Sequence, residues 1–81
     1  MANKQIVSPL PGTFYRQSAP DKPPFKAEGD VVAVGETIGL VEVMKMFNAV
    51  PAGLNGTVVA VLVKDNELVE YGQPLFRIQP L

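Results

Sequence analysis

The residue of this chain best placed to take part in chemistry is Lys45, which two methionines flank in the tripeptide Met44-Lys45-Met46. A lysine ammonium group in water is charged and is a poor nucleophile, and catalytic lysines need burial or a cationic neighbour. A lysine at an exposed turn has neither, so it is better suited to being modified by another enzyme. The flanking thioethers are soft and adaptable, so such an enzyme can recognise them without locking the turn.

A second interpretation treats the same tripeptide as ordinary strand. Residues two apart share one face of a strand, so Met44 and Met46 would lie in the core and Lys45 would point to solvent. The tripeptide alone does not separate these two interpretations. The elements around it must do so.

The composition excludes several classes of protein. The 81 residues suffice for one small domain, which we expect to span residues 1–81. The chain is 47% hydrophobic. Its net charge of −1 provides no excess of positive charge with which to bind nucleic acid or an anionic membrane. It has no histidine and no cysteine, which removes the commonest general base, the commonest metal ligand and any thiol nucleophile. We therefore expect no catalytic residue, no metal site and no independent enzyme.

Two segments bear on localisation. The longest apolar run, Val58 to Val63, is too short to span a bilayer. Residues 1–5 are not followed by the apolar segment of a signal peptide. We therefore expect a cytoplasmic protein that contacts no membrane.

The expected secondary structure is a series of short strands. Eight prolines and seven glycines interrupt the chain every few residues, and no segment keeps a helical period for long. Short β-branched segments alternate with turn-forming residues. The expected strands are residues 6–7, 13–15, 31–32, 37–43, 47–50, 57–63, 68–69 and 75–78. Many short strands at regular spacing predict an all-β sandwich or barrel.

The two halves of the chain align as an internal repeat. A shift of 44 residues superposes the first part of each half: Ile6 on Val50, Leu10 on Leu54, and Gly12-Thr13 on Gly56-Thr57. A shift of 37 superposes the second part: Val31-Val32 on Leu68-Val69, Gly35 on Gly72, Ile38 on Leu75, and Val41 on Ile78. Because the shifts of 44 and 37 differ by seven, the first half carries an insertion of about seven residues between Tyr15 and Val31.

The repeat predicts an arrangement in space. Two repeats of about four strands would form two four-stranded sheets related by a pseudo-twofold axis, which together close one core. The join between the repeats falls near Met44 to Met46, so it becomes a hairpin tip far from both termini. The repeat thus places Lys45 at an exposed turn independently of any motif. The insertion, Gln17 to Pro24, is polar and proline-rich, which predicts a stiff protruding loop.

Four segments carry a resemblance to a known family: residues 8–15, 34–37, 41–48 and 56–58. They resemble the biotinyl domain of biotin carboxyl carrier proteins, closest to the carrier subunit of bacterial acetyl-CoA carboxylase, over essentially residues 6–78. The resemblance implies a flattened barrel, a barrel-sandwich hybrid, with biotin attached to Lys45 of the Met44-Lys45-Met46 motif at a hairpin tip. It also implies that the insertion, about residues 16–25, is the thumb loop that lies against the biotin in this family.

The chain departs from the family pattern in two places. Val43 stands where the family usually has alanine, and a bulkier side chain there could slow recognition by the biotin ligase. Full-length carrier subunits also have an N-terminal region and a flexible linker, whereas five residues precede Ile6 here. We therefore expect either a minimal carrier or an excised domain.

The resemblance implies a function in carboxyl transfer. A biotin protein ligase would attach biotin to Lys45, and a biotin carboxylase would carboxylate it. A carboxyltransferase would then pass the carboxyl group to an acyl-CoA, with acetyl-CoA giving malonyl-CoA for fatty acid biosynthesis as the expected reaction. The domain would be a non-catalytic carrier with no direct small-molecule substrate.

Four polar residues are candidates for further contacts. Glu42 and Asn48 flank the turn and could meet a partner enzyme. Asp21 and Lys22 lie at the tip of the insertion and could hydrogen-bond the biotin ring. For all four, simple solvation is the competing interpretation.

Two alternative functions stay open. The first is a lipoyl-type carrier domain, but lipoyl domains usually carry Asp-Lys-Ala at this turn, which Met44 and Met46 do not match. The second is an unmodified interaction domain of the same fold, which would leave Lys45 bare and the tripeptide unexplained.

Overall fold

The chain folds into short strands joined by tight turns; the computed structural model describes residues 3–19 and 21–81. Within these residues the strands are β1 (Lys4–Val7), β2 (Gly12–Tyr15), β3 (Val31–Val32), β4 (Thr37–Val43), β5 (Met46–Pro51), β6 (Gly56–Val61), β7 (Leu68–Val69) and β8 (Pro74–Pro80). Each expected strand is present, and neither end of any strand differs from the expected one by more than two residues. The described part of the chain contains no helix, as the spacing of proline and glycine predicts.

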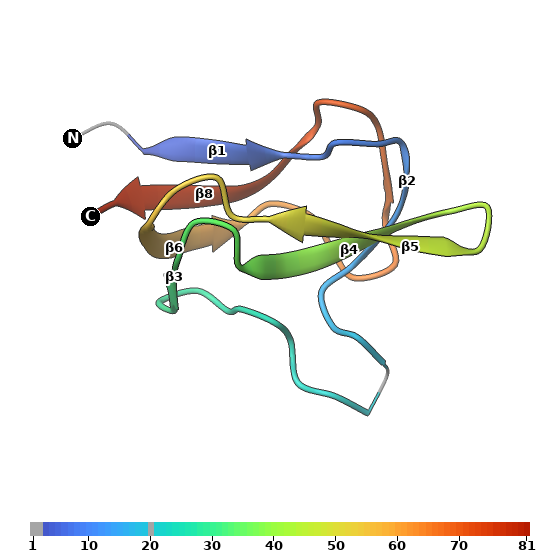
Figure 1. The fold of residues 1–81 in the computed structure, drawn as a ribbon, viewed down its shortest axis with the longest axis horizontal. Coiled ribbons are helices and arrows are strands. Elements are labelled where there is room, and N and C mark those ends of the chain that lie inside the picture. The colour runs from blue at the N-terminus through green and yellow to red at the C-terminus, as the bar shows by residue number, and fades with distance from the viewer. Residues whose placement is uncertain (1–2, 20) are drawn as a thin grey trace.

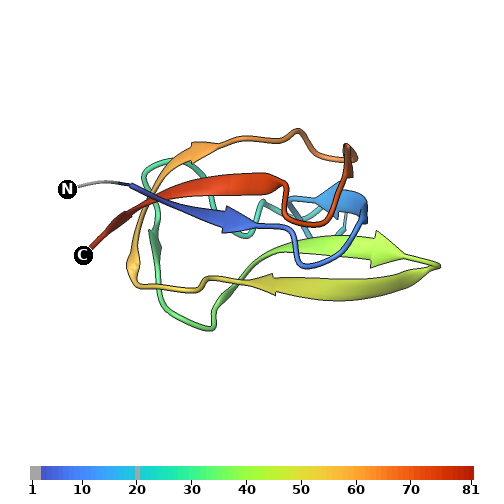
Figure 2. The same cartoon turned by 90° about the horizontal axis from the view of Figure 1, so that it is seen from above.

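The strands form two four-stranded antiparallel sheets that face each other (Figure 2). Their strand orders are β1-β8-β6-β3 and β5-β4-β2-β7. The expected all-β flattened sandwich is therefore confirmed. The order also shows something the sequence did not predict: each sheet takes two strands from each half of the chain. The repeats are interleaved, so neither half can complete a sheet alone.

The pseudo-twofold relation extends to the register of the strands. Ile6 pairs with Phe76, and Val50, which is 44 residues after Ile6, pairs with Gly39, which is 37 residues before Phe76. The register of β1 against β8 shifts just after this pair, and the register of β4 against β5 shifts at the same place. The internal repeat is therefore a structural one.

The core between the sheets draws on both halves. Phe14 and Phe76 meet edge to face at its centre, with their ring centroids 5.8 Å apart and their planes at 70°. Aliphatic side chains surround them: Ile6, Val32, Ile38, Val41, Val50, Ala52, Val58, Val63, Val69, Leu75 and Ile78. Each large apolar side chain buried in this way contributes about 1.5–3 kcal/mol to folding. This core fixes β4 and β5, which carry the hairpin.

Two glycines mark the places where strands cross most closely. A Cβ atom on Gly12 would lie 2.4 Å from the carbonyl oxygen of Glu42, and one on Gly56 would lie 2.4 Å from that of Gln79. The two sites are equivalent under the repeat. Close backbone approach therefore accounts for the Gly-Thr pair at the start of both β2 and β6.

The repeat breaks after Tyr15. There β2 ends, whereas β6 continues past the equivalent residue, Val59, through a register shift and pairs with β8 as far as Val61. The first half leaves the sheet, and residues 16–19 and 21–25 belong to a loop that protrudes from the sandwich (Figure 1). We call this loop the thumb. The insertion expected from the broken repeat is confirmed at this position.

The two ends of the thumb are joined to each other and to the sandwich. The Phe25 N–H donates to the carbonyl oxygen of Arg16 at 2.8 Å. Beyond Phe25, the Lys26 ammonium pairs with Glu36 at 2.9 Å and donates to the carbonyl oxygen of Val31 at 3.0 Å. The hydrogen bond from Lys26 holds the pKa of Glu36 below its ordinary value. The C-terminal end of the thumb is therefore fixed by an ion pair.

Candidate functional site

Met44 and Lys45 form the two-residue turn of the β4–β5 hairpin. Val43 pairs with Met46 across the turn, and the φ angles of Met44 and Lys45 are 51° and 66°. Two positive φ angles are typical of a type I′ turn, where Asn-Gly is the usual sequence. The left-handed conformation costs other residues about 1–2 kcal/mol each. Backbone geometry disfavours Met44 and Lys45 at these two positions. We therefore expect that their side chains have a function that outweighs this cost.

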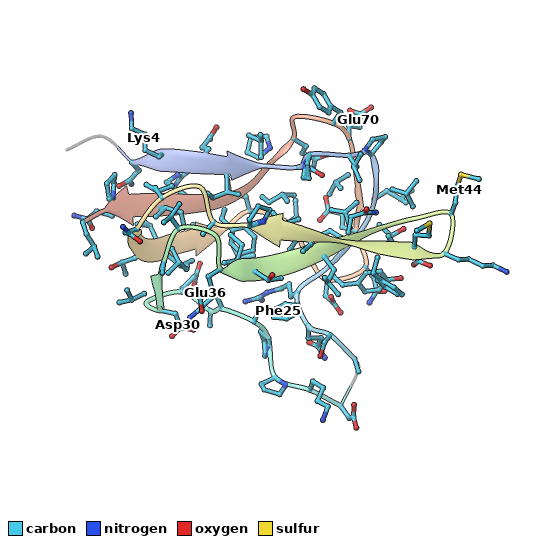
Figure 3. All side chains as sticks on the ribbon, in the orientation of Figure 1. Lys4, Phe25, Asp30, Glu36, Met44 and Glu70 are labelled. Atoms are coloured by element: carbon cyan, nitrogen blue, oxygen red, sulfur yellow. The ribbon has the colours of Figure 1, made fainter. Side chains whose placement is uncertain are left out.

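The side chains at the tip of the hairpin are exposed. Met44 is 91% exposed and Met46 is 70% exposed, and Lys45 is exposed between them. The interpretation of the two methionines as core residues is therefore wrong. Figure 1 shows the tip at the end of the molecule opposite the start of β1 and the end of β8. In Figure 3, Met44 projects away from the body at that end, and Lys4 lies at the other.

Side chains below the tip brace the hairpin. The Tyr15 hydroxyl donates to Oε1 of Glu42 at 2.8 Å, and its ring packs against that of Phe47 with centroids 5.7 Å apart. The Asn48 amide donates to the carbonyl oxygens of Val41 at 3.2 Å and Met46 at 3.3 Å. Glu42 and Asn48, expected as candidate contacts for a partner, thus bond within the domain. Their contact with a partner stays a prediction.

The Tyr15–Glu42 bond predicts a pH effect. Because the hydroxyl donates to a carboxylate, the pKa of Tyr15 is raised above its ordinary value of 10.0. A raised pKa means that the fold favours the neutral phenol, so the bond's contribution to stability is complete below the unfolded pKa and is lost as pH rises through the folded pKa. In a titration followed by tyrosine absorbance, we expect Tyr15 to ionise at higher pH than it does in Glu42→Gln. An unchanged titration in that variant would contradict this assignment.

A hollow of about 190 Å³ lies where the thumb meets the hairpin. Its walls come from the thumb, from β2 and β5, and from the β6–β7 turn: Tyr15, Gln17, Ser18, Ala19, Phe47, Asp65 and Asn66. Asp21 and Lys22, the expected contacts of the insertion, are exposed and do not line it. The structure therefore places residues 17–19 of the thumb, rather than its tip, beside the hairpin.

Asp65 and Asn66 were not predicted from the sequence as part of the site. They follow β6, about 50 residues after the start of the thumb, so no local pattern links them to it. Val43, the departure from the family pattern, is partly buried and packs against the core. Its side chain therefore supports the hairpin from below, and its effect on a ligase stays a prediction.

Metal binding and membrane insertion each need a structural feature of their own. The described residues contain no group of three or more acidic, histidine or cysteine side chains that could hold a metal ion. In residues 3–19 and 21–81 there is also no helix long and apolar enough to cross a membrane.

Comparison with known proteins decides the family. The model of the family described as "Biotin-requiring enzyme" matches residues 4–78. The chain belongs to this biotin-requiring family. The match covers strands β1 to β7, the Met44–Lys45 turn and β8 as far as Ile78.

Several curated proteins that this chain resembles are named biotin carboxyl carrier protein of acetyl-CoA carboxylase. The protein of Nostoc sp. is 43% identical over 76 residues, which are 94% of this chain and 42% of that protein. The Streptococcus pyogenes protein is 45% identical, over 91% of this chain and 45% of its own. The Chlamydia pneumoniae protein is 47% identical, over 90% and 44%. The expected resemblance is confirmed, and the chain spans less than half the length of these relatives.

Solved structures of carboxylases share the fold. A single-chain, multi-domain long-chain acyl-CoA carboxylase superposes with a TM-score of 0.81 at 24% identity, covering 98% of this chain and 7% of that one. The urea carboxylase of Kluyveromyces lactis superposes with a TM-score of 0.78 at 28% identity, covering 98% and 6%. In both, the match is one small part of a much longer chain.

Proposed function

We propose that this chain is a biotin carrier domain and that Lys45 is the residue to which biotin is attached. The observation that carries the proposal is the type I′ turn, in which Met44 and Lys45 adopt φ angles of 51° and 66° at the far end of the sandwich. Exposed thioethers on both sides of the amine offer a ligase soft apolar contacts. A structural turn would have no need of these residues.

The chemistry of attachment follows from the amine. An amide would join the Lys45 Nζ to the carboxyl group of biotin, with overall loss of one water. ATP hydrolysis by the ligase would drive this amide formation. The amide removes the lysine charge from the tip and leaves a long neutral tether. Once bound, biotin supplies a ureido nitrogen that can take up and release a carboxyl group. The domain itself presents the tether and supplies no catalytic group.

The structure offers a place that fits such a group. The hollow beside the hairpin combines aromatic walls, Tyr15 and Phe47, with the polar side chains of Asp65 and Asn66. A small bicyclic ring with N–H and C=O groups on one edge suits this mixture of walls. Residues 17–19 of the thumb would cover it from the other side.

The partners and the reaction follow from the relatives' names. We propose that the domain works with a biotin carboxylase and a carboxyltransferase of acetyl-CoA carboxylase, in the cytoplasm, after modification by a biotin protein ligase. Its contribution would be to raise the local concentration of the tethered group to about millimolar at each docking site. The carboxyl acceptor would be acetyl-CoA, because the relatives from Nostoc, Streptococcus and Chlamydia are carrier proteins of acetyl-CoA carboxylase.

A labelling experiment tests the proposal. The biotinylated protein is incubated with a biotin carboxylase, ATP and labelled bicarbonate, beside Lys45→Arg carried through the same steps. We expect ATP-dependent label on the wild-type protein alone. A fully biotinylated protein that takes no label would contradict the carrier function, and equal label on Lys45→Arg would contradict the site. Modification by a lipoate ligase instead would favour the lipoyl-type alternative.

A further inference from the structure

The ladder between β2 and β7 ends in an unusual hydrogen bond. The Phe14 N–H donates to the carbonyl oxygen of Glu67 at 2.8 Å, and the Asn66 N–H donates to the carbonyl oxygen of Phe14 at 2.7 Å. The next donor along this edge is the N–H of Arg16, the first residue of the thumb. It donates to Oδ1 of Asp65 at 2.8 Å. A side-chain carboxylate therefore satisfies the backbone donor at the point where the chain leaves the sheet.

The other half of the molecule provides an internal comparison. There Val58 and Gly29 repeat the bonds of Phe14 and Asn66, with the Gly29 N–H donating to the carbonyl oxygen of Val58 at 2.8 Å. Glu28 stands in the place of Asp65, and Ala60 stands in the place of Arg16. No hydrogen bond joins the Glu28 side chain to Ala60 in the described part of the chain. The carboxylate contact is thus confined to the half that carries the thumb.

Asn66 has a conformation that glycine would adopt with less strain. Its φ is 67°, and its equivalent in the other half is Gly29, with φ of 94°. The Asn66 side chain, which glycine lacks, donates from Nδ2 to Oδ2 of Asp65 at 3.0 Å. With one carboxylate oxygen held by Asn66, the other faces the Arg16 N–H. The Asn66 side chain makes this turn less favourable than glycine would, and the same side chain orients the Asp65 carboxylate.

We propose that Asp65 and Asn66 are positioning residues for the thumb: Asp65 ties its first residue, Arg16, to the sandwich, and Asn66 holds the Asp65 carboxylate in place. Both side chains also line the hollow beside the hairpin. Asp65 and Asn66 therefore fix the position of Arg16, the first residue of the thumb, and also form one wall of the hollow. The relevance to biotin rests on the proposed function, whereas the ordering of the thumb does not.

The far end of the thumb has its own attachment, which makes a clean test possible. The Lys26–Glu36 ion pair at 2.9 Å holds that end regardless of Asp65. Losing the Asp65 carboxylate should therefore release the Arg16 N–H without unfolding the sandwich, while the hydrogen bond from the Phe25 N–H to the Arg16 carbonyl oxygen remains. We expect its effect to be local, at Arg16 and the residues that follow.

Amide hydrogen exchange of the unmodified protein, followed by NMR, tests the proposal in three variants. In Asp65→Ala we expect exchange at the Arg16 amide to become about tenfold faster or more, because a hydrogen bond to a charged group is lost. In Asn66→Gly we expect faster exchange at Arg16 together with a melting temperature that is not lowered, since the strain at φ 67° is relieved. Glu28→Ala, the equivalent change in the other half, should alter neither quantity.

The possible outcomes separate positioning from general support. Faster exchange confined to the root of the thumb, with the core amides of Phe14 and Val58 unchanged, supports the proposal. Unchanged exchange at Arg16 in Asp65→Ala would overturn it. So would a uniform rise at all amides with a lower melting temperature, because that describes lost stability. Since the protein is not biotinylated, none of these results depends on Lys45.

A second experiment links Asp65 and Asn66 to the tethered group. In the biotinylated protein, we expect magnetisation transfer between the biotin protons and residues 17–19, and its loss in Asp65→Ala. Transfer that survives in Asp65→Ala would overturn the claim that this pair sets the hollow. No attached biotin in the wild-type protein would instead count against the proposed function.

Discussion

Exchanging Lys45 with its neighbour, in the double variant Met44→Lys with Lys45→Met, should slow biotin attachment by the ligase about 100-fold or more. The exchange keeps the composition and charge of the tip and moves the amine by one residue. In a type I′ turn the two central side chains leave the backbone in different directions. An amine that is misplaced by even about 1 Å loses the alignment with the activated carboxyl group that the ligase requires.

Initial rates of biotin incorporation, followed by mass spectrometry, measure this effect. Met44→Leu serves as the control, because it keeps Lys45 in place and changes only the thioether. We expect that control to stay within about tenfold of the wild type, since an apolar side chain of similar volume is retained. If the exchanged protein were modified at the wild-type rate, the turn would not position the amine and the argument from its φ angles would be wrong.

Gly12→Ala is expected to destabilise the fold by about 3 kcal/mol or more. The new Cβ would lie 2.4 Å from the carbonyl oxygen of Glu42 and 2.8 Å from a methyl carbon of Val41, both on β4. Backbone in the middle of a sheet cannot move aside as the end of a flexible side chain can. For a domain of this size, such a loss lowers the melting temperature by roughly 12 °C or more. Calorimetry or circular dichroism measures it.

Two other glycines complete this experiment. Gly56→Ala should behave like Gly12→Ala, because its Cβ would lie 2.4 Å from the carbonyl oxygen of Gln79. Gly53→Ala is the matched control: nothing lies within 4 Å of its Cβ, so we expect a change of about 0.5 kcal/mol at most. Equal melting temperatures for Gly12→Ala and Gly53→Ala would show that the close approach of Gly12 to β4 does not require glycine at this position.

The sequence predicts the strands and the turn well because both depend on local patterns. Alternating β-branched residues and turn residues mark each strand, and the repeat locates Lys45 at the join of the halves. The break in the repeat after Tyr15 likewise locates the thumb. These features need no knowledge of which strands become neighbours.

The interleaving of the halves and the walls of the hollow could not be predicted in this way. Strand pairing is a non-local choice, and either half has apolar faces that suit more than one partner. The contact of Asp65 with Arg16 joins residues 49 apart in the chain. The repeat contains a partial signal, because Asn66 stands where the other half has Gly29. Asparagine adopts a positive φ less readily than glycine does, so an asparagine in the place of a glycine indicates that its side chain has a role.

The intact mass of the protein after incubation with biotin, ATP and a biotin protein ligase tests the central claim most directly, with Lys45→Arg treated in parallel. The account predicts an increment of one biotin on the wild-type chain and none on Lys45→Arg, although that variant keeps the other four lysines, Lys4, Lys22, Lys26 and Lys64. An increment that survives in Lys45→Arg would contradict the assignment of the site. No increment on either the wild type or Val43→Ala would contradict the biotin carrier itself.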